Sequence, residues 1–246
     1  YSLEDVCLEM SSLGKGDIRE PFIEVTYPNG SSTTDMVFDR AEIIQGKEEY
    51  DTLPGSYDDN GEVEQLVIYL KDRNYNLTLE LHYYVYEKCD IITRSAKLVN
   101  SGNESVRLER LMSMQLDLNE SDYELSFFNG AWAREMNRSR IPIRAGKYVN
   151  ESVTGTSSNR ANPFFMIGRS STTEDYGECY GFNLIYSGNH YEAAQVNSYG
   201  KLRLVSGINP ATFSYIIEAG KCFEAPEAVL TYSYKGYNRM SHNMHE

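Results

Sequence analysis

The residues that suggest chemistry most directly lie in one short string, Asn129 to Glu135, which holds the only tryptophan of the chain. An indole beside a guanidinium, as in Trp132 and Arg134, can stack on the apolar face of a sugar while the arginine donates forked hydrogen bonds to hydroxyl groups. The alternative is structural: Trp132 anchors the seam between two β-sheets, and Arg134 pairs with Glu135. Of the two interpretations, we favour the structural one.

Acidic residues are numerous, but they carry no specific signal. The 36 aspartates and glutamates can supply many carboxylate pairs of the kind used in acid–base hydrolysis. The densest runs lie beside Gly, Tyr or Ser in turn-like contexts, at Glu48-Glu49, Asp58-Asp59 and Glu174-Asp175. We interpret them as solvated loop charges.

The histidines offer a second kind of acid–base chemistry. His82 or His190, paired with a glutamate in an open cleft, would suit a mutarotase-like enzyme, but His82 falls in a strand pattern where a structural histidine is commoner. His242 and His245 are three positions apart and would need a third partner to bind a metal. We therefore predict no metal site and no cofactor, and the residues alone leave a carboxylate pair or a His–Glu pair open.

Motifs for other reactions are missing from the chain. There is no G-x-S-x-G elbow, no phosphate-binding G-x-x-x-x-G-K-[ST] loop and no H-E-x-x-H string. The four cysteines, which form no C-x-x-C pair, are Cys7, Cys89, Cys179 and Cys222. Cys89 and Cys179 lie in apolar and aromatic runs, so we predict buried thiols, a reducing compartment and a cytoplasmic location.

Composition excludes two classes of partner. The chain has 246 residues, with 23 Lys and Arg against 36 Asp and Glu and a formal net charge of -13, so the basic footprint of a nucleic-acid binder is absent. No apolar run approaches the length of a membrane helix. We expect a soluble protein with neither nucleic-acid nor membrane partners.

The elements that must position these residues are predicted to be strands. Twenty Tyr and nine Phe favour strands, and apolar residues alternate with a period of two from Val63 to Gly220. The expected strands are Glu64 to Asp72, Asn76 to Glu87, Ile91 to Val99, Val106 to Leu118, Glu178 to Tyr186, Ala193 to Val205, Thr212 to Glu218 and Ala228 to Tyr234.

Their spacing, without helical patterns between them, predicts an all-β fold of antiparallel sheets packed as a sandwich. The turn cluster Asn100 to Asn103 is typical of a hairpin between its two flanking strands. The one expected helix spans Met240 to Glu246, with Ser241 as its N-cap. An ending of this kind indicates a cut within a longer chain.

Nine strings, in this order, resemble the N-terminal domain of bacterial α-galactosidases of glycoside hydrolase family 36. They are Gly16 to Pro21, Leu53 to Tyr57, Gly130 to Glu135, Gly155 to Ser158, Asn162 to Phe164, Tyr180 to Phe182, Tyr186 to Asn189, Gly207 to Pro210 and Pro226 to Leu230. Each is weak alone, but together they cover almost the whole chain. Family members usually have a histidine where this chain has Asn159.

The resemblance implies a large two-sheet β-supersandwich, related in shape to galactose mutarotase-like sandwiches, over residues 1–236. Residues 237–246 would begin a linker toward a (β/α)₈ barrel that is missing from the chain. Family enzymes hydrolyse terminal α-linked galactose with retention, using two aspartates of that barrel. The nucleophile lies in a Trp-Asp string, whereas here Trp132 is followed by Ala133, so the isolated chain is expected to be inactive.

The resemblance also implies partners. In the family this domain packs on the barrel, and in tetrameric members it borders the active-site mouth of a neighbouring subunit. The candidates for contact with the substrate or another subunit are Leu53, Pro54, Tyr57, Trp132, Arg134 and Glu135. The alternative function is a free-standing carbohydrate-binding β-sandwich that presents Trp132 and tyrosines as a stacking platform.

Overall fold

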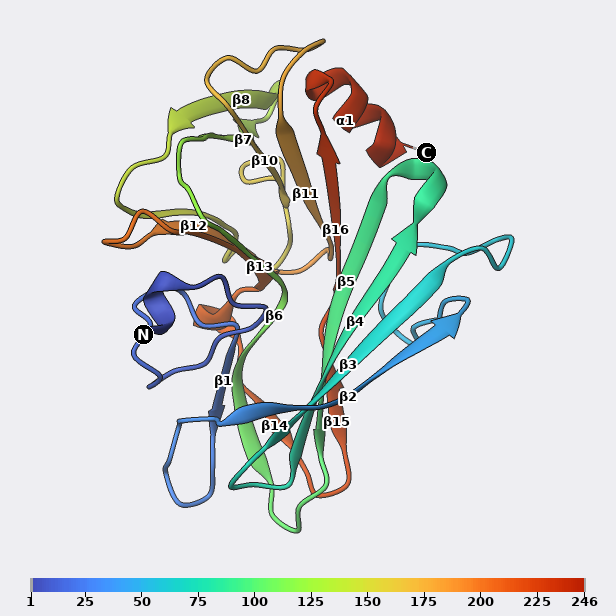
Figure 1. Ribbon diagram of the computed structural model, residues 1–246, viewed down its shortest axis with the longest axis vertical. Coiled ribbons are helices and arrows are strands. Elements are labelled where there is room, and N and C mark those ends of the chain that lie inside the picture. Colours follow the sequence, from blue (N-terminus) through green and yellow to red (C-terminus); the bar gives the residue numbers. More distant parts are fainter. Residues whose placement is uncertain (1, 246) are drawn as a thin grey trace.

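The computed structural model describes residues 2–245 and consists of two antiparallel β-sheets that face each other (Figure 1). The predicted all-β, two-sheet sandwich is confirmed. The larger sheet has ten strands in the order β2-β3-β4-β5-β16-β11-β10-β7-β8, with β15 also paired to β5. The smaller sheet has six strands in the order β1-β6-β13-β12-β9, with β14 also paired to β6.

Strands of the larger sheet come from all parts of the chain. They are β2 (Met36–Gln45), β3 (Glu64–Asp72), β4 (Leu77–Tyr86), β5 (Ile91–Asn100), β7 (Glu124–Ala131), β8 (Arg134–Pro142), β10 (Phe164–Gly168), β11 (Cys179–Ile185), β15 (Cys222–Glu224) and β16 (Glu227–Ser233). The smaller sheet contains β1 (Ile23–Thr26), β6 (Val106–Leu118), β9 (Gly146–Glu151), β12 (His190–Val196), β13 (Leu202–Ile208) and β14 (Tyr215–Ile217). Short 3-10 helices lie at Leu3–Asp5, Glu87–Cys89 and Pro210–Thr212.

Two predictions about how the strands are connected were wrong. The segment predicted as one strand, Ala193 to Val205, is the β12–β13 hairpin, because the Asn197 side chain accepts hydrogen bonds from the amides of Tyr199 and Lys201 and turns the chain. The turn after β5 closes no hairpin either, since β5 and β6 belong to different sheets.

Hydrogen bonds of Asn100 explain why the chain passes from one sheet to the other after β5. The side-chain nitrogen of Asn100 donates to the carbonyls of Glu104 at 2.9 Å and Ile217 at 3.0 Å. Its side-chain oxygen accepts from the backbone amide of Gly102 at 3.0 Å. The bond to Ile217 ties the turn to the end of β14, and no ladder forms between β5 and β6. Local turn residues therefore look the same in an arch between sheets as in a hairpin.

The helix α1 (Gly236–His245) begins four residues before the predicted Met240, and Ser241 lies inside it rather than at its N-cap. Its first amides are satisfied from a distant loop: the amide of Tyr237 donates to the carbonyl of Thr173 at 3.1 Å, and that of Asn238 to Glu174 at 2.8 Å. No side-chain cap was therefore needed in the local sequence. Among the described residues, no helix is long and apolar enough to cross a membrane.

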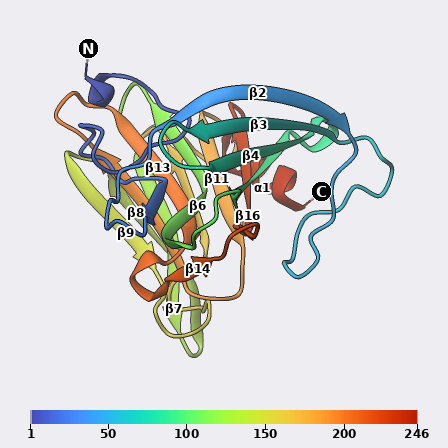
Figure 2. The same cartoon turned by 90° about the horizontal axis from the view of Figure 1, so that it is seen from below.

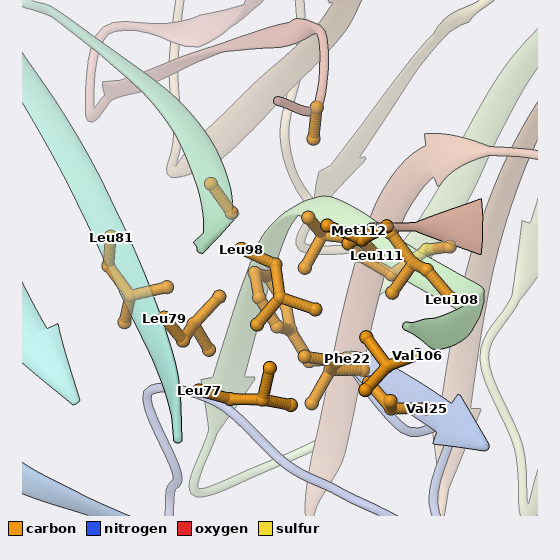
Figure 3. Close-up of a cluster of buried hydrophobic side chains, with 14 of the residues drawn as sticks. Phe22, Val25, Leu77, Leu79, Leu81, Leu98, Val106, Leu108, Leu111 and Met112 are labelled. Carbon is orange, nitrogen blue, oxygen red and sulfur yellow. The ribbon is translucent and has the colours of Figure 1, made fainter. Parts of the chain in front are cut away.

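The core fills the space between the sheets in two clusters. In the first, leucines of β4 and β5 such as Leu79 and Leu98 face Phe22 and the side chains of β6 such as Leu108, all with no exposed surface (Figure 3). The second joins β7, β10 and β11 to β12 and β13 through Phe182, Leu204 and their neighbours. Burial of these side chains supplies the main driving force for the fold.

The N-terminal segment, residues 2–22, is fastened to the smaller sheet by a buried ionic cluster. Arg203 of β13 makes two hydrogen bonds of 2.7 Å to Asp117 of β6, and its guanidinium lies 2.8 Å from Asp17. Arg19 pairs with the same Asp17 at 3.0 Å, and all four side chains are at most 2% exposed. The Gly16 to Pro21 string is therefore structural.

A second buried polar group lies on β12. The carboxyl of Glu192, 3% exposed, accepts a hydrogen bond of 2.6 Å from Asn150, and its other oxygen lies 3.6 Å from Nδ1 of His190. Desolvation raises the pKa of Glu192 to about 8. Burial also lowers the pKa of His190. Both groups are therefore neutral at pH 7.

This arrangement predicts a stability that falls as the pH rises from about 7 to 8. In that window unfolded His190 is mostly neutral, whereas Glu192 is ionised when unfolded and largely protonated when folded, so the folded state binds more protons. The free energy of unfolding should fall by up to about 1.4 kcal/mol per pH unit. Urea unfolding at several pH values measures it. Glu192→Gln should flatten the slope, while exposed Glu135→Gln should leave it unchanged; equal slopes in all three proteins would contradict this assignment.

Candidate functional site

The outer face of the larger sheet, turned away from the smaller sheet, is hollowed into a groove of about 830 Å³. We call it the outer groove. Its floor is formed by β5, β16, β11 and β10, one wall by the loop of residues 46–63, and the other by the β7–β8 hairpin. The end of α1 and the loop of residues 46–63 lie on the same side of the sheet (Figure 2).

Aromatic and aliphatic side chains dominate the lining of the outer groove. They are Tyr57, Tyr86, Ile91, Phe128, Met136, Phe164, Ile185, Val229 and Met244. Polar side chains add hydrogen-bonding groups, namely Ser56, Asp59, Thr93, Asn162, Asn183, Ser241, Asn243 and His245. Burial raises the pKa of Tyr86 to about 12, so this hydroxyl keeps its proton at neutral pH.

The wall formed by residues 46–63 is held down by one carboxylate. Glu227, the first residue of β16, has no exposed surface, and its Oε2 lies 2.9 Å from the ammonium of Lys47. The same oxygen accepts a hydrogen bond of 3.1 Å from the amide of Ser56, whose hydroxyl donates to the other carboxylate oxygen. A fully buried carboxylate requires such partners.

Aromatic rings complete this anchor. The Lys47 ammonium lies 4.6 Å from the ring centre of Tyr50 and 4.7 Å from that of Tyr84, and the Tyr50 hydroxyl donates to Ser95 of β5 at 2.9 Å. Gly55 is required here, since a Cβ atom would come within 2.7 Å of the Tyr50 ring and 2.8 Å of Glu227. Tyr57, two residues further on, is left 82% exposed at the groove.

The favoured interpretation of Trp132 was wrong. The side chain is 90% exposed at the tip of the β7–β8 hairpin, so it anchors no seam between sheets. Among residues 2–245, no ion pair joins Arg134 to Glu135; the carboxylate instead accepts from the amide of Ala133 at 2.9 Å. Ala133 has a φ of 58°, a left-handed conformation typical of a tight turn.

The structure brings only some of the predicted site residues together. Tyr57 lines the outer groove, whereas Leu53 and Pro54 lie in the supporting part of the same loop and do not line it. Trp132, Arg134 and Glu135 are exposed on the hairpin, and Met136, which follows them, reaches the groove. The two candidate strings thus stand on opposite walls of one groove.

Sequence reasoning missed Glu227 and the groove floor. The available signal was an acidic residue that opens the apolar run of β16, within the Pro226 to Leu230 string. Its partners Lys47 and Ser56 lie about 180 and 171 positions away, so no local pattern connects them. The floor residues alternate with core residues along strands that are apolar on both faces, which hides the groove in the sequence.

Neither candidate histidine lines the outer groove. His82 is 4% exposed and contacts Gln65 at 3.0 Å, and His190 is fully buried with Nε2 2.9 Å from the carbonyl of Ala161. Each histidine is thus buried rather than set beside a glutamate in either large groove, so a mutarotase-like centre has no support in this fold. Within residues 2–245, no group of three His, Cys, Asp or Glu side chains is placed to hold a metal.

The burial of the cysteines differs in part from the prediction. All four are free thiols, and Cys179 is buried as predicted. Cys89 is only partly buried, because it lies in the short 3-10 helix between β4 and β5 and borders the outer groove.

The anchor on Glu227 predicts a large loss of stability on its neutralisation. Glu227→Gln leaves the Lys47 ammonium buried without its counterion and should lower the free energy of unfolding by about 3–5 kcal/mol. Urea unfolding measures the change. The control is Glu62→Gln, which removes the exposed pair with Lys88 and should cost about 1 kcal/mol or less. Equal losses in the two variants would show that the carboxylate does not hold the loop.

Comparison with known proteins identifies this architecture. Residues 1–218 match the family model described as the glycosyl hydrolase family 36 N-terminal domain. Alpha-galactosidase AgaA of Geobacillus stearothermophilus is 38% identical over 247 residues, which cover 100% of this chain and 34% of that protein. Alpha-galactosidase 2 of Hypocrea jecorina is 33% identical over 237 residues, covering 96% of this chain and 32% of the relative.

Solved structures agree with this match. The α-galactosidase of Lactobacillus brevis superposes with a TM-score of 0.97 at 38% identity, over 99% of this chain and 33% of that one. A variant of AgaA in complex with stachyose gives a TM-score of 0.97 at 37% identity, over 100% and 34% of the two chains. The chain thus spans about a third of the length of these relatives. It belongs to the family of glycosyl hydrolase family 36 N-terminal domains.

Proposed function

We propose that this chain is the N-terminal domain of an α-galactosidase that hydrolyses terminal α-linked galactose with retention. The relatives that share its fold and sequence are named α-galactosidases, and their chains are about three times as long. The catalytic aspartates lie in a (β/α)₈ barrel beyond the matched third. This chain supplies packing and subunit contacts, and it has no catalytic aspartate of its own.

The outer groove carries the proposal. Its lining presents apolar side chains to the surface, including Ile185 and Val229 of the floor and Met244 of α1, on a face that the smaller sheet does not cover. A surface of this kind is suited to contact with another folded unit. The barrel packs against the outer groove, residues 1–236 form the sandwich, and residues 237–246 begin the linker that leads to the barrel.

The two walls of the groove serve a second contact. Tyr57 and Trp132 are the most exposed aromatic side chains of their loops, at 82% and 90%. In a homo-oligomer, a tetramer by resemblance, these walls reach the active-site mouth of a neighbouring subunit. Leu53 and Pro54 support Tyr57 there, while Arg134 and Glu135 offer hydrogen bonds to an α-galactoside.

The cysteines and the relatives bear on where the protein is found. Four free thiols, two of them exposed, favour a reducing compartment, so we place the protein in the cytoplasm. A bacterial source agrees with relatives from Geobacillus and Pediococcus, although similar proteins occur in fungi. A free-standing carbohydrate-binding sandwich gains no support, since each relative named above carries this region as about a third of a longer chain.

A chimera tests the docking of the barrel. This chain replaces the matching third of Geobacillus AgaA, and raffinose hydrolysis is measured alongside the chain alone, which should give no turnover. Ile185→Asp places a charge on the groove floor and should lower the activity of the chimera at least tenfold by loosening the barrel. Ile18→Asp is the control, at a 70% exposed site beyond the smaller sheet. Turnover by the chain alone, or equal activity of both variants, would contradict the proposal.

The contact with a neighbouring subunit is tested in the same chimera through Tyr57. Tyr57→Ala should reduce kcat/KM for raffinose roughly tenfold, because an aromatic contact at a substrate is worth about 1 kcal/mol or more. Tyr199→Ala, at an exposed tyrosine outside the groove, is the matched control and should leave kcat/KM unchanged. A Tyr57 variant as active as the control would exclude this role.

A further inference from the structure

A second groove, of about 700 Å³, lies on the opposite, inner face of the larger sheet. We call it the inner groove. Along β4, β5 and β16 most of its lining side chains, such as Tyr83, Ile92 and Tyr232, alternate with those facing the outer groove. Tyr86 and Ile91 border both grooves, and Leu116 of β6 closes one side. It marks the part of the inner face that the smaller sheet leaves open. None of the functions proposed above uses this groove.

Aromatic rings dominate the surface of the inner groove. Five tyrosines line it, namely Tyr83, Tyr86, Tyr180, Tyr232 and Tyr234. The rings of Tyr180 and Tyr232 are 4.9 Å apart, and Tyr232 and Tyr234 are 44% and 65% exposed. Buried tyrosines normally serve a core, but rings left this open in a hollow form a platform on which another flat apolar surface can stack.

Fixed polar groups stand beside this platform. Arg94, only 5% exposed, donates to the Tyr83 hydroxyl at 3.0 Å and lies 2.7 Å from a carboxylate oxygen of Glu9. The Tyr83 hydroxyl also donates to Glu9, and Arg94 donates to the carbonyl of Gln115. These contacts hold a guanidinium, a hydroxyl and a carboxylate in one orientation before any ligand arrives, which lowers the entropy lost on binding.

The inner groove has no net charge. Its lining contains three acidic side chains, Glu9, Glu87 and Asp90, and three basic ones, Arg94, Lys235 and Arg239. The formal charges of the lining therefore cancel, whereas the whole chain carries a formal net charge of -13. A balanced groove on an acidic protein selects neither an anion nor a cation by its field. The chemistry that remains is that of a neutral ligand with apolar faces and many hydroxyl groups.

We propose that the inner groove binds a neutral oligosaccharide. One sugar ring stacks on Tyr232 and Tyr234, where the carbon-bound hydrogens of a pyranose meet the ring faces. Hydroxyl groups of the next ring exchange hydrogen bonds with Arg94, Tyr83 and Glu9, which supply both donors and acceptors. Binding here is non-catalytic and brings sugar chains to the domain independently of the outer groove.

Titration of the 246-residue chain, labelled with ¹³C in its tyrosine rings, tests the proposal. Raffinose and maltotriose, both neutral trisaccharides, should shift the signals of Tyr232 and Tyr234 in a saturable way. Trigalacturonate, with a carboxylate on every ring, should bind more weakly. The proposal is overturned if the neutral sugars shift no groove tyrosine up to their solubility limit, if the charged sugar binds more tightly, or if the shifts centre on Trp132.

Variants separate binding in the groove from changes in folding. Tyr234→Ala and Tyr232→Ala should each weaken raffinose binding roughly three- to tenfold. Tyr199→Ala and Tyr176→Ala, both at exposed aromatic residues outside the groove, should leave the affinity unchanged. Tyr234 lies at a 65% exposed site, so its variant should keep the thermal unfolding temperature of the parent chain. Unchanged affinity in a folded Tyr234→Ala protein would also overturn the proposal.

Discussion

The buried carboxylate of Glu227 is the interaction on which the outer groove of this domain depends. It sits at the start of β16, near the middle of the ten-stranded sheet, and binds the Lys47 ammonium and both hydrogen-bonding groups of Ser56. A charge without exposed surface is tolerated only when its partners arrive with it. The loop of residues 46–63 therefore has one well-defined position, and that position creates a wall of the outer groove and presents Tyr57 to solvent.

Both faces of the larger sheet are covered only in part. On the outer face, glycines decide where helix α1 can pack. There, Gly168 and Gly181 leave space for Tyr237 and Met240 of α1, since a Cβ atom at either position would collide with these side chains. Without that space the helix would stand off the sheet and the end of the outer groove would open. On the inner face, the smaller sheet covers only part of the strands, and tyrosines occupy the uncovered part.

The edge of the larger sheet formed by β2 is protected against pairing with another strand. Strand β2 has only β3 as a neighbour, and its register shifts between Phe38 and Arg40, which places Asp39 in a bulge. Asp39 pairs with Arg40 and with Lys71 of β3, so charges follow the open edge. Bulges and charges of this kind prevent edge-to-edge association. The β2 edge is thus protected against pairing with a strand of another molecule.

The sequence by itself determined only the strands with clear period-two alternation, which records which face of a strand is buried. Of these, β3 and β6 agree with prediction at both ends, whereas β1, β2 and the strands from β7 to β10 were not predicted. The ordered strings also determined the family. Only the tertiary structure decided that β5 and β6 part into different sheets, that α1 is capped by the loop near Thr173, and that Trp132 is exposed. Each of these depends on partners more than 60 positions apart or on the packing of whole sheets, and a local pattern records neither.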